Sequence, residues 1–398
     1  MVYTLFSMFN PLSLIRKNKR NKSFLAIDLG SSLIKISRFS FLPDNRLLLE
    51  DISTVNTPEG AVGLGVITDL DSTFEALKSS VSPYDNVIFG LSGESVFGFA
   101  TTVKIKRPAY DEKISSGELN EIIKRIQELA FIEAGQIQLS KIGCGETDIE
   151  MVNSAVISSK IDGALVEDVV GKVGKHIEIG LFTSFAEKSV LSGLLELCKK
   201  LKINFTAASS QMYSLSKLLC ANQKGTFNAV LIDFGGDKTD VGICYGGGIV
   251  ATKTLDFGGT QLTKEIAAIL DVALNEAEKK KVSYEEGTLG AEQIKEITSK
   301  VLNYWLAGIE TVLENFEGIK VFPPKIFIFG GGGLTYDLMR VLKERSWYEN
   351  FPFKFVPEVE IVSIEKLSDI IEDPNGFLKD LRNIVPVSLG LIGLEIFG

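Results

Sequence analysis

The sequence predicts an α/β protein that contains a duplicated domain and an inserted α+β segment. Residues 24–40 read as an apolar strand, a Gly/Ser turn and a second, alternating strand, which is the pattern of a β-hairpin. Residues 229–247 repeat this pattern about 200 residues later, and such self-similarity indicates a duplication. A strand, four glycines and a helix follow over residues 325–344.

The composition is that of a globular protein with more than one packed unit. The chain has 398 residues, of which 45% are hydrophobic, and this length exceeds that of most domains with a single hydrophobic core. A net charge of −9 argues against broad nucleic-acid binding. Four widely spaced cysteines without a CxxC pair favour reduced thiols in the cytosol. The lone His176, which we expect to be structural, excludes multi-histidine metal sites and Ser/His/Asp chemistry.

The N-terminal residues 1–22 form an apolar run followed by five basic residues. A secretory signal would carry its charges first, and Pro11 interrupts a stretch that is already too short to span a bilayer. Three interpretations stay open: an interfacial anchor whose basic flank meets anionic lipid, an arm that docks on a partner, and a disordered leader. Peripheral membrane contact, if present, is expected through residues 2–20.

The rest of the chain alternates between helical and strand patterns. Residues 112–135 have a Ser-x-x-Glu start and helical periodicity, and residues 150–185 read as strands around a loop, so together they predict the α+β insert. Residues 384–397 predict an apolar helix whose small residues pack it against the first domain. Further helices are predicted over residues 187–203, 210–220, 259–270 and 291–316.

Three glycine-rich turns carry the functional signal. Such turns let backbone N–H groups approach an anion without a Cβ in the way, which suits phosphate oxygens. The "GGGG" turn at residues 330–333 lacks the GxGxxG spacing of dinucleotide-binding proteins, and no GxxxxGK[ST] loop is present. The distinctive feature is the set of two Asp-x-Gly hairpins and one strand-GGGG-helix in this order.

This set resembles the actin/hexokinase/Hsp70 ATPase superfamily over about residues 24–398, in which two RNase H-like domains clasp nucleotide phosphates between facing hairpins. The resemblance implies an actin-like ATPase fold with ATP and Mg²⁺ as cofactors. In the first phosphate loop it assigns Asp28 to hydrated magnesium, the backbone of Gly30, Ser31 and Ser32 to phosphate, and Lys35 to the phosphate tail. A carboxylate suits this place, because Mg²⁺ is a hard cation that prefers oxygen ligands and keeps several of its waters.

The same resemblance gives roles to the second hairpin and the third turn. It places Asp233 across the metal, as a metal ligand and catalytic residue, with Gly235, Gly236 and Thr239 around the terminal phosphate. Gly331, Gly332 and Gly333 are assigned to the adenosine. Gln211 is the only candidate for orienting a water, and ordinary polarity at a helix start is the alternative interpretation.

Within the superfamily the sequence resembles the FtsA and PilM families. Gly258, Gly259 and Thr263 match their GG-x-x-x-T element, and Glu278 and Lys281 match an AE-x-x-K element that would face ribose and base; a solvated helix face is the alternative. The insert over residues 101–184 is similar to the FtsA version of the SHS2-type 1C domain, which favours FtsA over PilM. The implied boundaries are 1–22 for the leader, 23–100 and 185–225 for subdomain 1A, 226–384 for domain 2 and 385–398 for a helix that returns to 1A.

Two departures from the FtsA pattern lead to further expectations. The sequence ends at "LIGLEIFG" where FtsA has a linker and an amphipathic helix, so attachment to membrane or partner is expected at the N-terminus. Asp237 and Lys238 stand where FtsA has glycine and threonine. An acid beside the terminal phosphate repels ATP unless Lys238 or the metal offsets it, which predicts weakened binding or hydrolysis.

The resemblance implies three functions from different classes. The favoured one is an FtsA-like ATP-binding protein of bacterial division with slow ATP turnover, which forms filaments at the inner face of the cell membrane and links an FtsZ-like tubulin homologue to it. The second is a PilM-like cytoplasmic scaffold for type IV pilus or secretion assembly, which binds a short peptide of an inner-membrane partner. The third, a small-molecule kinase, lacks a visible acceptor motif.

Overall fold

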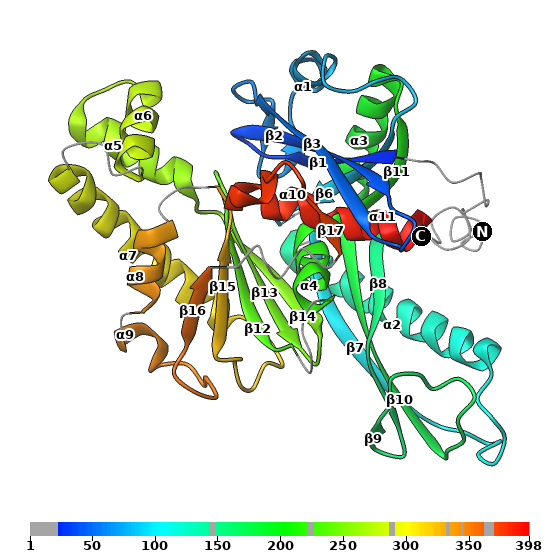
Figure 1. Ribbon diagram of the computed structural model, residues 1–398. Coiled ribbons are helices and arrows are strands. Elements are labelled where there is room, and N and C mark those ends of the chain that lie inside the picture. The colour runs from blue at the N-terminus through cyan, green and yellow to red at the C-terminus, as the bar shows by residue number, and fades with distance from the viewer. Residues whose placement is uncertain are drawn as a thin grey trace.

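The computed structural model describes residues 23–94, 96–142, 148–221, 227–285, 291–331, 335–343, 345–361 and 370–397. Two related sheets form its frame (Figure 1). The first half contains a six-stranded sheet in the order β11-β6-β1-β2-β3-β17. Its strands are β1 (Ser23–Leu29), β2 (Leu33–Phe41), β3 (Leu47–Asn56), β6 (Asn86–Leu91), β11 (Asn204–Ser210) and β17 (Ile371–Glu372).

The second sheet has nine strands and repeats the order of the first. Its part β16-β15-β12-β13-β14 has the same pairing as β11-β6-β1-β2-β3, with an antiparallel hairpin in the centre and parallel strands on one side. These strands are β12 (Ala229–Phe234), β13 (Thr239–Tyr245), β14 (Gly248–Leu255), β15 (Lys325–Phe329) and β16 (Glu358–Ile361). The duplication and the two hairpins predicted from the sequence are therefore confirmed.

The insert extends the second sheet. Its elements are β7 (Val96–Lys106), α2 (Ser116–Ile142), β8 (Ile149–Ile161), β9 (Ala164–Leu165) and β10 (His176–Glu187). Strands β7, β10, β8 and β9 continue the sheet beyond β14, and residues of α2 pack with them in two small cores. Ser115 Oγ accepts a hydrogen bond of 3.1 Å from Glu118 N, so the predicted helix start is correct.

Strand periodicity decides which way the hairpin residues point. In β1, Leu25 and Ile27 pack on the side of α1 (Leu70–Leu77) and α3 (Lys188–Leu201), whereas Phe24 and Ala26 face a central layer. In β12, Val230 and the alternate residues pack against α7 (Ala291–Glu314) and α8 (Thr335–Leu342). Asp28 alternates with Leu25 and Ile27 in β1, and Asp233 alternates with Val230 in β12. Both aspartates therefore lie on the strand faces that are turned toward the central layer.

The central layer consists of α4 (Gln211–Ala221), α10 (Ile384–Ser388) and α11 (Gly390–Phe397), which lie between the two sheets (Figure 1). The predicted C-terminal helix is thus two short helices that pack on the first half. Its small residues permit this packing, because a Cβ at Gly393 would lie 2.1 Å from Phe24 Cζ and one at Gly390 would lie 3.0 Å from Phe39 Cε1.

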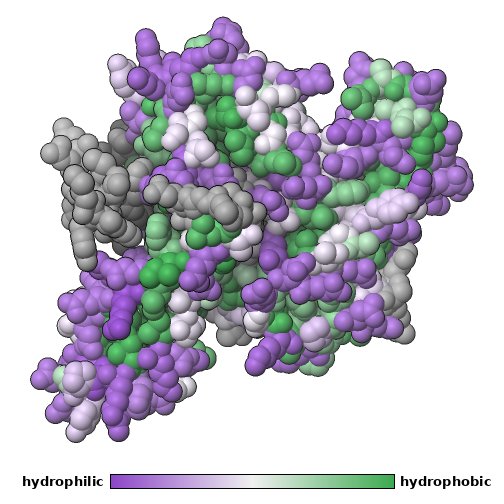
Figure 2. Space-filling view, turned by 180° about the vertical axis from the view of Figure 1, so that it is seen from behind, coloured by the Kyte–Doolittle hydropathy of each residue, from purple (hydrophilic) through white to green (hydrophobic). Residues whose placement is uncertain are grey.

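Two lobes project from this body, the insert and a unit made of α5 (Gly259–Leu270) and α6 (Leu274–Glu285) (Figures 1 and 2). Figure 2 shows a band of hydrophobic surface on the insert lobe between hydrophilic residues. The exposed apolar side chains of the insert are Tyr110, Leu129, Ile132, Leu139, Val156, Leu165 and Val173. The remaining described elements are the strands β4 (Val62–Gly63) and β5 (Val66–Ile67), the helix α9 (Arg345–Tyr348), and the 3-10 helices η2 (Phe377–Lys379) and η3 (Leu381–Asn383).

Candidate functional site

The candidate site lies where the parallel strands of the two halves end. Asp28 is near the carboxyl end of β1, and β6 and β11 end beside it at Leu91 and Ser210. In the other half, β12 and β15 end at Phe234 and Phe329. Open α/β sheets bind ligands outside the carboxyl ends of their strands, so this arrangement favours a site between the two halves.

The two predicted phosphate loops face each other across this gap. A Cβ at Gly236 would lie 2.9 Å from both Ser31 Oγ and Ser32 Oγ, so the second loop touches the first only because residue 236 is a glycine. The first loop is braced by Thr57, whose hydroxyl donates to Gly30 O at 2.7 Å and whose amide donates to Ser32 O at 3.0 Å. The resemblance implied roles for Gly30, Ser31, Ser32 and Gly236 but not for Thr57, and the structure brings the two loops together.

The second loop is anchored on the start of helix α5. Gly259 N donates to Gly235 O at 3.0 Å, and Thr260 N donates to Gly236 O at 2.8 Å. A Cβ at Gly258 would lie 2.4 Å from Gly236 O, so only a glycine permits this close approach of two backbones. The predicted glycines 258 and 259 therefore position the loop through its carbonyl groups.

Asp233 is the electrostatic centre of the site. Its side chain is buried, and burial, followed by the nearby charges of Asp240 and Asp28, raises its pKa to about 7, while Lys35 and Lys238 oppose the shift. Gly330 has a φ of +100°, and a Cβ there would lie 2.6 Å from Asp233 Oδ1 and 2.2 Å from Phe234 O. The first glycine of the "GGGG" turn thus lies directly against this carboxyl group.

The first-half carboxylate Asp28 has a buried partner. Gln211 is 4% exposed, and its Nε2 donates a hydrogen bond of 2.6 Å to Asp28 Oδ1. Gln211 is the first residue of α4, so this contact reaches the site from the central layer. Lys35 lies on β2 opposite Asp28 in the register, and its Nζ donates to Arg382 O at 2.7 Å.

The side chains predicted to face ribose and base form a network behind the second loop. Thr263 Oγ1 donates to Glu278 Oε2 at 2.5 Å, and Lys281 Nζ lies 2.8 Å from the same carboxylate oxygen. Lys281 Nζ also donates to Thr263 Oγ1 at 3.0 Å and to Gly259 O at 3.4 Å. Lys281 is only 5% exposed, so the alternative of a solvated helix face is wrong for this residue.

Thr239 occupies a different position from the one expected. It is fully buried at the start of β13, its Oγ1 donates to Phe257 O at 2.6 Å, and the same oxygen accepts from Trp305 Nε1 at 3.0 Å. With both of these bonds made, the hydroxyl does not face the gap. The role at the terminal phosphate that was predicted for this side chain is therefore corrected to a structural one.

The side chains of the adjacent residues Asp237 and Lys238 have different neighbours, one in each half of the molecule. Asp237 Oδ1 accepts a hydrogen bond of 2.8 Å from Thr260 Oγ1 in the same half. Lys238 extends toward the first half, where a Cβ at Gly65 would lie 2.4 Å from its Nζ. Gly331 lies beside Arg382, while Gly332, Gly333 and the leader 1–22 lie outside the described residues.

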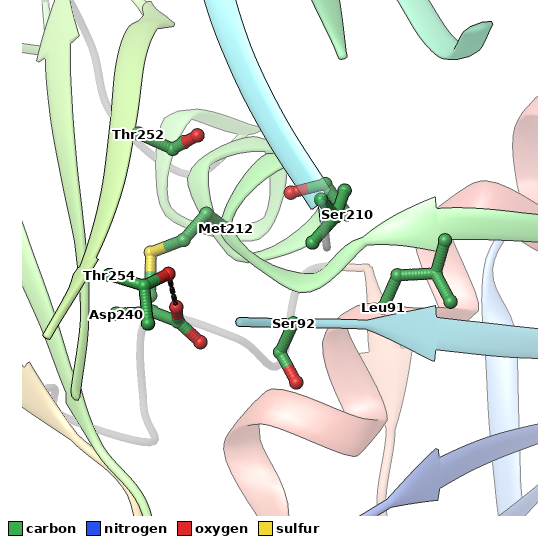
Figure 3. Close-up of a pocket in the computed structure, with 8 residues that line it drawn as sticks. Leu91, Ser92, Ser210, Met212, Asp240, Thr252 and Thr254 are labelled. Atoms are coloured by element: carbon green, nitrogen blue, oxygen red, sulfur yellow. Dashed lines mark hydrogen bonds between the residues drawn. The ribbon is translucent and has the colours of Figure 1, made fainter. Parts of the chain in front are cut away.

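Sequence reasoning missed Asp240, although the hairpin register contains the signal. Because the turn pairs Phe234 with Thr239, residue 240 must lie opposite Asp233, and the structure confirms this pairing. Asp240 is buried and accepts hydrogen bonds from Thr254 Oγ1 at 2.5 Å and from Gly93 N at 3.3 Å. It lines a cavity of about 10 Å³, large enough for one water, together with Ser92, Ser210, Met212 and Thr254 (Figure 3).

Among the residues that the structure describes, no three His, Cys, Asp or Glu side chains form a group that could hold a metal ion on its own. Of the described helices, none is both long and apolar enough to span a bilayer.

Comparisons with known proteins show which proteins this chain resembles. The family model "Cell division protein FtsA" matches residues 230–320, which include the second loop and the Thr263 network. FtsA of Helicobacter pylori strain J99 is 21% identical over 87% of this chain and 72% of its own length. FtsA of Bacillus subtilis strain 168 is 21% identical over 66% of this chain, which spans only 58% of that relative.

Among solved structures, the PilM-PilN type IV pilus biogenesis complex contains a chain with the same fold. It superposes with a TM-score of 0.66 at 17% identity and covers 94% of this chain and 99% of that one. This likeness confirms the predicted actin-like fold. Taken with the FtsA matches, it supports the predicted resemblance of this chain to the FtsA/PilM family of actin-like ATPases.

Proposed function

We propose that the chain binds ATP with magnesium between its two facing loops. The observation that carries this proposal is the contact of Gly236 with Ser31 and Ser32, which brings two glycine-containing turns together at the carboxyl ends of both sheets. Anionic phosphates bind well where backbone groups approach without a Cβ in the way. In this proposal ATP serves as a conformational ligand with slow turnover.

The carboxyl groups fit a magnesium ion in such a site. Asp28 and Asp233 supply oxygen ligands from opposite halves, and Asp240 stands beside Asp233 as a further carboxylate. Mg²⁺ usually binds one or two carboxylates, substrate phosphates and several waters, so a site with few protein ligands is sufficient. The bound ion would neutralise phosphate charge, and Gln211 would keep Asp28 in place through its hydrogen bond.

We assign the adenosine to the second half. Glu278 is the exposed end of the network behind the loop, with its side chain about half accessible, while Lys281 and Thr263 hold it in place. Gly331 borders the same gap next to the residue that contacts Asp233. The segments 23–100 and 185–225, the insert 101–184 and the segments 226–384 and 385–398 remain our proposed subdomains.

The proposed cellular role is that of an FtsA-like division protein. The relatives named cell division protein FtsA support this role, because one of them aligns with 87% of the chain. In this role the protein forms filaments at the inner face of the membrane, links an FtsZ-like tubulin homologue to it, and contacts lipid through residues 2–20. The second candidate is a PilM-like scaffold that binds a peptide of a membrane partner, and the fold shared with a PilM-PilN complex supports it.

The decisive experiment measures magnesium-dependent ATP binding by calorimetry on the full chain, with electron microscopy of the same sample. Asp233→Ala should abolish binding, whereas Asp71→Ala, which removes an exposed carboxylate of α1, should not. ATP-dependent filaments and binding of an FtsZ tail peptide support the FtsA-like role. ATP binding by a protein that stays monomeric and captures only a membrane-partner peptide supports the PilM-like role, and absence of ATP binding refutes the nucleotide site.

A further inference from the structure

Lys238 extends from the second loop to two glycine turns of the first half. A Cβ at Gly65 would lie 2.4 Å from Lys238 Nζ, and one at Gly93 would lie 2.9 Å from it. Both glycines have a left-handed backbone, with φ of +83° and +90°. The ammonium group therefore occupies a space that exists only because both residues lack side chains. We call the turns Leu64–Gly65 and Ser92–Gly93 the glycine cradle.

The two turns of the cradle are fitted to each other. A Cβ at Gly65 would lie 2.3 Å from Ser92 O, and a Cβ at Gly93 would lie 2.5 Å from Leu64 O. Leu64 forms the tip between β4 and β5 with a φ of +49°, which is rare for a residue of this size. Such a conformation persists only where the surroundings fix it, so this tip has a defined place against Gly93.

A second contact from the same hairpin reaches the cradle. Gly93 N donates to Asp240 Oδ1, and Asp240 lies two residues after Lys238. Leu91, the last residue of β6, and Ser92 precede Gly93, and β6 pairs with β1 at Asp28 through Gly90. The cradle is therefore a junction between the strand ends of the first half and the second phosphate loop.

The charge of Lys238 has no carboxylate partner at ion-pair distance among the described residues. The cradle that surrounds the ammonium group consists of backbone atoms, and the carbonyl groups of Leu64 and Ser92 lie next to its two glycines. The preceding residue is fixed on the other side, since Asp237 accepts from Thr260 in its own half. Two neighbouring residues of one loop therefore lie against opposite halves, Asp237 with a hydrogen bond from Thr260 and Lys238 beside the two glycine turns.

We propose that Lys238 is a positioning residue, which seats its ammonium in the glycine cradle and so fixes the distance between the two phosphate loops. This inference rests on the proposed nucleotide site, because the two loops that Lys238 would position are the proposed phosphate loops. It explains why a loop that faces an anion carries Asp and Lys: Asp237 binds α5, and Lys238 binds the opposite half.

The first test needs no nucleotide. Amide hydrogen exchange is measured for the turns at residues 62–67 and 91–94 in the full chain, in wild type, Lys238→Met and Lys238→Gln. Lys253→Met is the matched control, because Lys253 lies on β14 with its Nζ 6.0 Å from the ring centroid of Phe316, away from the cradle. Exchange about tenfold faster in both turns is expected for the Lys238 variants alone. Exchange as slow as in wild type would overturn the proposal.

The second test separates position from charge. ATP–magnesium affinity should fall about tenfold in Lys238→Met, and equally in Lys238→Arg, because the larger guanidinium keeps the charge without fitting the cradle. If Arg restores affinity while exchange in the turns stays fast, the residue acts through its charge and the positioning role is wrong. If wild type binds no ATP, the proposed function fails, and the exchange result still decides whether Lys238 holds the two halves together.

Discussion

Gln211 Nε2 donates a hydrogen bond of 2.6 Å to Asp28 Oδ1, which joins residues 183 positions apart in the chain. The amide is buried and belongs to the central layer, whereas the carboxylate lies near the carboxyl end of β1 in the first sheet. The orientation of Asp28 is therefore set by a helix that lies between the two halves.

Gln211→Ala should weaken ATP–magnesium binding about tenfold or more, since residues that orient a ligating carboxylate usually have effects of this size. Its matched control is Gln138→Ala, because Gln138 is equally buried and donates at 3.1 Å to the carboxylate of Glu187 in the insert. Both variants should lose roughly 1–3 kcal/mol of stability in urea unfolding. Calorimetry then distinguishes them, and equal affinities in the two would contradict a role of Gln211 at Asp28.

Lys281→Met should destabilise the α5–α6 lobe and reduce ATP affinity. The substitution removes the donor for Thr263 Oγ1 and Gly259 O and leaves Glu278 without its ion pair, at an expected cost of roughly 1–3 kcal/mol. Lys280→Met is the control, since Lys280 pairs with Glu276 on the exposed side of the same helix and should cost under about 0.5 kcal/mol. Urea unfolding and calorimetry measure both effects; similar losses in the two variants would argue against the network.

Asp233→Asn should stabilise the metal-free protein at pH 8 and have little effect near pH 4. The pKa of Asp233 rises from 3.8 to about 7 on folding, so the native state binds the extra proton between these values. The contribution of this group to stability is therefore lost as pH rises from about 4 to 7, and above pH 7 the ionised group costs a few kcal/mol. Thermal unfolding across this range measures the difference between wild type and Asp233→Asn.

Asp162→Asn provides a control of opposite sign. Backbone hydrogen bonds from His176 and Lys175 lower the pKa of Asp162, so its contribution is present above the unfolded value of 3.8 and disappears as pH falls below it. This variant should be less stable than wild type at pH 7. A Tm of Asp233→Asn that follows the same pH dependence would show that burial does not raise the pKa of Asp233.

Gly393→Ala should destabilise the protein, whereas Gly193→Ala should stabilise it. Both glycines lie inside helices, and alanine there normally gains up to about 1 kcal/mol. A Cβ at Gly393 would collide with the ring of Phe24, while one at Gly193 would have nothing within 4 Å. Overpacking costs roughly 1–3 kcal/mol, so the two variants should differ in sign in urea unfolding.

Periodicity and turn chemistry predicted most of the fold. The hairpins, the long helix of the insert and the C-terminal helices follow from patterns within a few residues of one another. The parity of β1 and β12 also determines that Asp28 and Asp233 face the central layer. The hairpin register alone places Asp240 opposite Asp233, but our sequence analysis did not include Asp240 among the site residues.

The remaining features depend on contacts that local sequence does not contain. Thr239 is removed from the site by Trp305, a residue 66 positions away whose indole donates to its hydroxyl. Lys238 meets Gly65 and Gly93 only because two turns of the other half lie together. Such long-range partners decide whether a polar residue near a glycine turn faces a ligand or supports the fold.

The junction of β7 with β14 has a mechanical consequence. Phe99 pairs with Ala251, and Gly98 N donates to Thr252 Oγ1 at 2.9 Å, so the insert is hydrogen-bonded to the sheet that bears Asp233. A force on the insert is therefore transmitted along the hydrogen-bond ladder to the second half without passing through a flexible linker. If closure of the gap between the two halves displaces β14, a partner bound to the insert changes the affinity for the ligand that closes the gap. Because such coupling is reciprocal, that ligand changes the affinity for the partner by the same factor.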